Sequence, residues 1–329
     1  MGNYPENVGL KIRRAFYFTE VDPDPAQAVR AHVQALHLAR EEKMDPFSNE
    51  VIGMKIEFAR CLEKFGRPDE SLRIMDEVKT SCLGWLEEHD SDISQAGRRT
   101  HILKWACKIS TRLADLYSNP LMADEQKTEE NLVWAVETSI RESQRRQKEG
   151  LKPDEGDWLT PDEQGSEYEE LAHFYEGKDN YYFAAQLFLQ ALMLKPEKDC
   201  HAVVLMNNLA TAIAQQHPPV EPGAQAPSKN QLRESGRTWI RQALALAETI
   251  EPPARTSECD QGCAVAIHNL GEFAEMDGNI KEAREKYEEA ASIAHAIGLQ
   301  EGVIAAQEGL KRLTTGASKP RQKKRGWFS

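Results

Sequence analysis

The stretch LAHFYEGKDNYYFAAQLFLQALMLKP, from Leu171 to Pro196, decides the fold. Its first half places a small residue beside an apolar one and an aromatic residue three positions later, as Leu171-Ala172-x-x-Tyr175. Its second half reads Ala184-x-x-x-Phe188-x-x-Ala191. Both spacings bring the named side chains to one face of a helix. Small residues on that face allow close helix packing, so the stretch predicts two antiparallel helices that end before Pro196.

Six further partial copies of this pattern occur along the chain. They are Phe58-Ala59-x-x-Leu62 with Ser71-x-x-x-Met75-x-x-Val78, Leu270-Gly271-x-x-Ala274 with Ala283-x-x-x-Tyr287-x-x-Ala290, Leu113-Ala114-x-x-Tyr117, Leu209-Ala210-x-x-Ile213, Ala28-x-x-x-His32-x-x-Ala35 and Gly236-x-x-x-Ile240-x-x-Ala243. Repeated helix pairs of this pattern are typical of tetratricopeptide (TPR) repeats. The sequence therefore predicts an all-α, tetratricopeptide-type helical-repeat solenoid. We expect a right-handed superhelix of about six helical hairpins plus a C-terminal capping helix.

Breaks in the pattern divide the chain into four segments. Residues 1–149 are expected to form N-terminal TPR-like repeats, and 150–163 a break or linker that contains Gly150 and Gly156. Residues 164–313 are expected to form C-terminal TPR repeats with the capping helix. Residues 314–329 are expected to be a basic, aromatic-ended, disordered tail. The sequence Thr160-Pro161-Asp162-Glu163 is a strong helix start.

Composition excludes several classes of function. The formal net charge of −12 argues against general nucleic-acid binding, which needs a basic surface. No apolar run approaches the ~20 residues of a membrane-spanning helix. No phosphate-binding loop and no nucleophile with a catalytic context stand out, so we expect neither an enzyme nor a cofactor. Because such solenoids usually offer a surface to another protein, the expected function is protein binding.

The chain also resembles one family of TPR proteins, the fungal adaptors of the mitochondrial i-AAA protease. The stretches that carry the resemblance are Leu10–Arg40, Asp45–Leu62, Leu113–Tyr117, Val133-Trp134-Ala135-Val136-Glu137, Cys200–Ala210 and Cys259–Phe273. The resemblance implies a non-catalytic adaptor that recruits misfolded or unassembled mitochondrial proteins to an inner-membrane AAA protease. It also implies a location on the intermembrane-space side of the inner membrane. Family members carry an anchor helix before the repeats, and no such segment precedes Leu10 in this sequence.

The helical period and the geometry of the family predict a protein-binding groove. Residues two positions before and after Leu171, Leu209 and Leu270 should lie on the concave side. They are Glu169, His173, Asn207, Thr211, His268 and Glu272. The alternative is a solvated inner face without a ligand. Because Glu169 and Glu272 would repel an acidic tail, basic or apolar, unfolded segments are the preferred ligands.

Three cysteines are candidates for chemistry. Cys200, Cys259 and Cys263 stand at the starts of successive first helices, so a disulfide, a metal site with His201 or packed free thiols are all open. The spacing lacks the close C-x-x-C pairs of zinc sites, and no metal is assigned. We expect the other three, at 61, 82 and 107, to be buried as small apolar groups.

The C-terminal tail combines basic and aromatic residues, which suits an anionic membrane surface or a partner. Its residues are Lys319, Arg321, Lys323, Lys324, Arg325, Trp327 and Phe328. The alternative is a tail that only aids solubility.

Two other functions remain open from the sequence. One is a cytoplasmic, kinesin-light-chain-like TPR scaffold that binds cargo, because the longer repeats of that class suit residues 198–297. The other, more remote, is a metal-dependent activity at the cysteine cluster.

Overall fold

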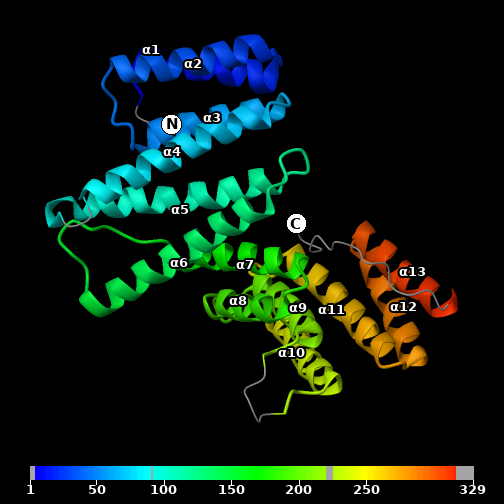
Figure 1. Ribbon diagram of the computed structural model, residues 1–329. Helices are drawn as coiled ribbons and strands as arrows, with labels where there is room; N and C mark the ends of the chain where they lie inside the picture. The colour runs from blue at the N-terminus through cyan, green and yellow to red at the C-terminus, as the bar shows by residue number, and fades with distance from the viewer. Residues whose placement is uncertain (1–3, 90–91, 220–224, 316–329) are drawn as a thin grey trace. The chain divides into compact units, whose positions relative to one another are not determined.

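The computed structural model describes residues 4–89, 92–219 and 225–315, and within these ranges the chain consists of helices joined by turns, without a β-strand (Figure 1). It divides into two compact units, Met1–Leu159 and Thr160–Ser329. The first unit contains α1 (Glu6–Phe16), α2 (Pro25–Glu41), α3 (Asn49–Lys64), α4 (Pro68–His89), α5 (Ala96–Ser118) and α6 (Glu125–Glu149), with a π-helical turn at Tyr17–Val21 and a 3₁₀ turn at Ile93–Gln95. The second unit contains α7 (Pro161–Gly177), α8 (Tyr181–Met193), α9 (Cys200–Gln215), α10 (Lys229–Thr249), α11 (Ser257–Met276), α12 (Ile280–Ala296) and α13 (Gln300–Thr315).

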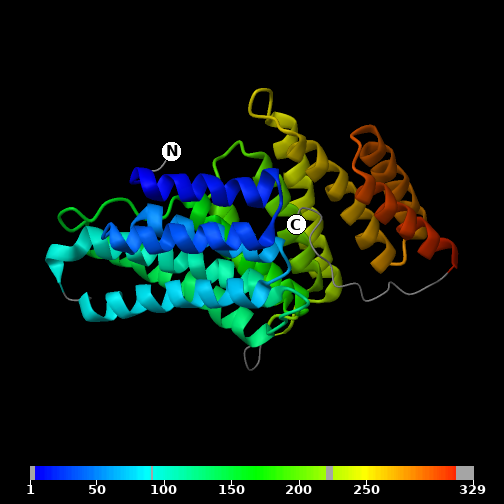
Figure 2. The same ribbon diagram turned by 90° about the horizontal axis from the view of Figure 1, so that it is seen from above.

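The helices of each unit stack as antiparallel pairs. In the first unit these are α1 with α2, α3 with α4, and α5 with α6, and each pair packs on the next. In the second unit they are α7 with α8, α9 with α10, and α11 with α12, and α13 packs on the last pair. The orange and red helices α12 and α13 lie side by side in both Figure 1 and Figure 2. The predicted all-α, TPR-type fold of about six hairpins and a capping helix is confirmed for the described residues.

Polar side chains cap the starts of α3 and α7. The hydroxyl of Ser48 accepts a hydrogen bond from the backbone N–H of Val51 at the start of α3. At the start of α7, Thr160 and Glu163 satisfy each other's backbone N–H groups, with Pro161 as the first helical residue. These contacts occupy backbone donors that a helix start leaves without partners. The helix predicted from Thr160-Pro161-Asp162-Glu163 therefore begins at that point.

Small residues set the distance between helices. Gly262 of α11 faces α9 so closely that a Cβ atom there would lie 2.9 Å from Cγ1 of Val203. Ala184 and Ala191 of α8 are fully buried, as is Phe188 between them. Large side chains fill the space that the small ones leave, which is the packing that the repeated pattern predicts.

The segment that follows α6 packs within the first unit. The side chains of Trp158 and Leu159 are buried against Leu103 and Cys107 of α5. The carboxylate of Glu155 is also buried and pairs with Arg145 of α6. Much of the predicted linker is thus a loop with fixed side-chain contacts.

Candidate protein-binding surface

His201 links three first helices of the second unit. It lies in the first turn of α9, and its Nε2 atom is 2.7 Å from Oε2 of Glu169 on α7. Its Nδ1 atom is 2.6 Å from Oε1 of Glu258 on α11. One imidazole therefore fixes the register of α7, α9 and α11. A neutral ring could donate only one of these two hydrogen bonds, so this geometry requires the protonated form.

A second histidine extends this network along α7. Nδ1 of His173 is 3.2 Å from Oε2 of Glu176, and its Nε2 is 3.7 Å from Oε1 of Glu169. His173 and Glu176 are three residues apart, which places them on one helix face. We refer to Glu169, His173, Glu176, His201 and Glu258 as the His–Glu network.

The network perturbs the titration of its members. Hydrogen bonding to Glu169 raises the pKa of His201 to about 9 against the opposing effect of burial. Burial lowers the pKa of His173, but the hydrogen bonds to Glu169 and Glu176 outweigh it and raise the pKa to about 9. Burial raises the pKa of Glu169, but both histidines outweigh that effect and lower it to about 2. Both rings are therefore cationic at neutral pH and neutralise most of the acidic charge of this surface.

Four of the six predicted groove residues are buried in the structure, which corrects the prediction for them. The exposed fractions are 0% for Asn207, 6% for Thr211, 3% for His268 and 4% for Glu272. Only Glu169 and His173 keep partly exposed side chains, at 17% and 32%. The groove assignment therefore stays a prediction for these two alone.

The buried polar residues serve helix packing. Nδ2 of Asn207 donates a 2.9 Å hydrogen bond to the backbone carbonyl of Gly262 and so ties α9 to α11. The hydroxyl of Thr211 donates to the carbonyl of Asn207, one turn back on its own helix. Asn207 could not line a groove because Gly262 allows α11 to approach within hydrogen-bond distance of it.

His268 and Glu272 form a buried pair on α11. Nε2 of His268 is 3.3 Å from Oε1 of Glu272, and its ring centroid is 5.2 Å from that of Tyr287 on α12. Since both side chains are almost fully covered, the sequence argument that Glu272 presents charge to a ligand does not hold.

The structure joins Cys200 to Cys259 in a disulfide between α9 and α11. Cys263 is a free thiol, partly buried one turn further along α11. The disulfide lies next to the His–Glu network, because His201 follows Cys200 and Glu258 precedes Cys259. Cys61, Cys82 and Cys107 are buried free thiols in the first unit, as expected for small apolar groups.

All seven tail residues fall outside the residues that the structure describes. In residues 4–89, 92–219 and 225–315, no group of histidine, cysteine and carboxylate side chains has the arrangement of a metal site. Over the same ranges, no helix combines the length and apolar character needed to cross a bilayer.

Sequence reasoning missed Glu258 and Glu176. Glu176 carried a signal, because a carboxylate three residues after a histidine on a helix can reach it. For Glu258 the only signal in the sequence was weak, namely its position beside Cys259 at a helix start. Its contact with His201 depends on the register between two helices, and the two residues are 57 positions apart in the chain.

Comparison with known proteins supports the repeat class. The chain is 25% identical over 315 residues to a TPR repeat-containing protein of Schizosaccharomyces pombe, and the match covers 94% of this chain and 79% of that protein. No protein-family model matches the chain.

Solved structures show the same fold at low identity. The crystal structure of BtubC (BKLC) from P. vanneervenii is 14% identical, with a TM-score of 0.52 over 92% of this chain and 96% of that one. A crystal structure of a point variant of the TPR-like repeats from a candidate kinesin light chain of Podosopora anserina is 15% identical. Its TM-score is 0.50, and the match covers 78% of this chain and 100% of that one. The chain is therefore a TPR-type repeat scaffold, a class that generally binds proteins and is generally non-catalytic.

Proposed function

We propose that this protein is a non-catalytic adaptor that recruits misfolded or unassembled mitochondrial proteins to an AAA protease of the inner membrane. The observation that carries the binding part is the linkage of α7, α9 and α11 by His201. It holds three first helices in one register, so a segment of another protein would meet a fixed surface. Preorganisation of this kind lowers the entropic cost of binding.

The charge of this surface supports the predicted class of ligand. The His–Glu network holds three carboxylates and two cationic imidazoles, which leaves one excess negative charge. A basic or apolar, unfolded segment suits it better than an acidic one.

The protease as partner and the intermembrane-space location are supported by the resemblance to the i-AAA adaptors. An oxidising compartment also suits the disulfide between Cys200 and Cys259. The basic and aromatic residues of the tail, within 319–328, would add a contact with anionic lipid.

Proximity labelling with the tagged full chain in fungal cells tests the proposal. We expect an inner-membrane AAA protease and unassembled mitochondrial proteins among the labelled partners, together with import of the chain into mitochondria. A cytosolic chain that labels motor subunits and cargo would instead establish the kinesin-light-chain-like function. Sedimentation with cardiolipin-containing liposomes, comparing the full chain with a chain that ends at Thr314, tests the tail separately.

A further inference from the structure

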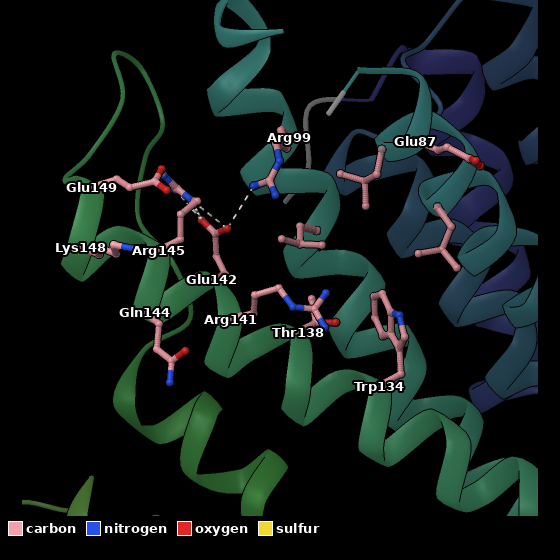
Figure 3. Close-up of a pocket in the computed structure, with 13 residues that line it drawn as sticks. Glu87, Arg99, Trp134, Thr138, Arg141, Glu142, Gln144, Arg145, Lys148 and Glu149 are labelled. Atoms are coloured by element: carbon pink, nitrogen blue, oxygen red, sulfur yellow. Dashed lines mark hydrogen bonds and ion pairs between the residues drawn. The ribbon is translucent and has the colours of Figure 1, made fainter. Parts of the chain in front are cut away.

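A pocket of about 670 Å³ lies within the first unit and is lined only by side chains of α4, α5 and α6 (Figure 3). Its volume is in the range of sites that hold a small ligand. The pocket belongs to the first unit and shares no residue with the His–Glu network.

One stripe along α6 carries the chemistry of the pocket. Trp134, Arg141 and Lys148 follow one another at intervals of seven residues and all line the pocket. Seven residues are close to two turns, so the three side chains leave one face of the helix at intervals of ~10 Å. The order along the stripe is aromatic, cationic, cationic.

The pocket is apolar around Trp134. Leu83 and Leu86 of α4 and Leu103 of α5 line it there. Trp134 and Leu86 also pack against the buried cluster that contains Leu103, so this end of the pocket has a fixed wall. It would accept one aliphatic or aromatic side chain.

The basic end of the pocket holds cations that the protein itself does not neutralise. Glu142 is buried, and Arg99, Arg145 and Arg146 surround it at 3.1, 2.7 and 2.9 Å. These arginines lower the pKa of Glu142 to about 2 against the effect of burial, so the carboxylate is ionised and fully engaged. Within the described part of the chain, neither Arg141 nor Lys148 has a hydrogen-bond or ion-pair partner, and Figure 3 shows Arg141 between the Glu142 cluster and Trp134.

Charge complementarity therefore selects the ligand. Glu87, on α4, is the one lining carboxylate without a partner among the described residues, and it stands apart from Arg141 in Figure 3. Along α6 an acidic group would meet two unneutralised cations in a chain whose net charge is −12. Local positive charge on an acidic protein favours an acidic partner at this pocket.

We propose that this pocket binds an extended acidic peptide segment with the pattern apolar-x-x-acidic-x-x-acidic. An extended chain in the polyproline II conformation advances ~3.1 Å per residue with three residues per turn, so residues three apart share one face and are separated by ~9 Å. That spacing matches the intervals between Trp134, Arg141 and Lys148. The apolar side chain enters the leucine-lined end, and the two carboxylates pair with Arg141 and Lys148. The inference rests on the protein-binding part of the proposed function and is independent of the protease.

Fluorescence anisotropy with the full chain tests the pocket. The probe is a labelled peptide of glycine and serine that carries one leucine and, three and six residues later, two glutamates. We expect saturable binding that weakens as salt is added. The double variant Arg141→Glu with Lys148→Glu should weaken binding ~10-fold or more, because two attractions become repulsions. The matched control is Arg30→Glu with Arg40→Glu, two exposed arginines of α2, which should leave the affinity unchanged.

Control peptides and a competitor separate the other occupants. A peptide with lysines in place of the glutamates, and one with serine in place of leucine, should each bind at least ~10-fold more weakly. Inorganic phosphate at equal ionic strength should not compete better than chloride. Any of three results would overturn the proposal. These are absence of binding, an affinity of the Arg141/Lys148 variant equal to that of the unmodified chain, and binding of the lysine peptide equal to that of the glutamate peptide.

The readouts also distinguish this inference from the proposed function. If the Arg141/Lys148 variant loses the peptide while no AAA protease is labelled in cells, the pocket stands and the adaptor function fails. If the protease is labelled but the peptide does not bind, the adaptor function stands and the pocket proposal fails.

Discussion

Nε2 of His201 lies 2.7 Å from the carboxylate of Glu169, although the two residues are 32 positions apart and belong to different helix pairs. The same ring contacts Glu258 of a third helix. Because the contact joins successive repeats, its protonation state affects how strongly the repeats of the second unit couple.

Stability of the second unit should fall as pH rises from about 6.5 to 9. An unfolded histidine has a pKa of about 6.5, whereas the pKa of His201 and of His173 in the folded protein is about 9. A raised folded pKa gives stability that is complete below the unfolded value and is lost as pH passes the folded value. Hydrogen exchange of α7, α9 and α11 at several pH values measures this loss.

The variant His201→Gln should remove much of that pH dependence and lower the free energy of unfolding by about 1–3 kcal/mol, since Glu169 and Glu258 lose their shared donor. His295→Gln, at an exposed histidine of α12, is the control and should change neither quantity. A pH profile of His201→Gln identical to that of the unmodified chain would contradict the role of this ring.

The disulfide gives a second prediction. Of the six cysteines, only four should react with a thiol reagent under denaturing, non-reducing conditions. Replacing both Cys200 and Cys259 by serine should destabilise the second unit by about 2–4 kcal/mol, because the crosslink closes a long loop in the unfolded chain. Cys263→Ser should retain the disulfide and lose one reactive thiol. Six reactive thiols in the unmodified chain would exclude the bond.

The contact between α9 and α11 should not tolerate a side chain at Gly262. In Gly262→Ala, the new Cβ would lie 2.9 Å from Cγ1 of Val203, and overpacking costs ~1–3 kcal/mol. The gain in helix propensity offsets only ~0.5–1 kcal/mol of that cost. Gly84→Ala, on an exposed face of α4 with nothing within 4 Å, should show the gain alone. Adding Val203→Ala to Gly262→Ala should relieve the clash, and urea unfolding curves of the three variants and the unmodified chain check the order.

The sequence predicted the fold well because its signals are local. The alternation of small and large residues at Ala184, Phe188 and Ala191 depends only on the period of one helix, and the capping residues Ser48 and Thr160 act within one turn. Each of these features can be recognised in the sequence without knowing what the helix packs against.

The candidate surface was predicted only in part, because it depends on how neighbouring helices are set against each other. Asn207 occupies the helical position expected for a groove, yet Gly262 brings α11 close enough to bury it. The contact of His201 with Glu258 requires α9 and α11 to begin at matching heights, which no single-helix pattern encodes. Glu169 and His173 remain candidates for the groove because their positions on α7 leave them partly exposed.

Neutralising Glu142 should destabilise the first unit. In Glu142→Gln, Arg99, Arg145 and Arg146 lose the carboxylate that they share, and loss of one partner of a buried charge cluster costs about 3–5 kcal/mol. The folded pKa of Glu142 is about 2, below that of an unfolded glutamate, so its contribution is present above about pH 4.5 and is lost as pH falls toward 2.

Glu149→Gln, at an exposed carboxylate 3.8 Å from Arg145, should cost less than ~1 kcal/mol. Hydrogen exchange of α5 and α6 locates the effect, and equal losses for the two variants would contradict it.

The capping helix should depend on Arg312. Its guanidinium donates to both carboxylate oxygens of Glu275 at 3.1 and 3.0 Å and to the hydroxyl of Tyr287 at 3.1 Å, so it joins α13 to α11 and α12. In Arg312→Met the carboxylate keeps only the Tyr287 hydroxyl as a donor, and α13 should exchange its amide hydrogens faster, by about 1–3 kcal/mol of local stability. Lys311→Met changes a neighbouring exposed cation without such contacts and should leave exchange as it is.

Because an exposed end of a stack leaves the last repeat half covered, loss of the cap should spread from α13 to α12 and fade toward α9. Uniform loss across the second unit would show instead that the unit unfolds as one cooperative block.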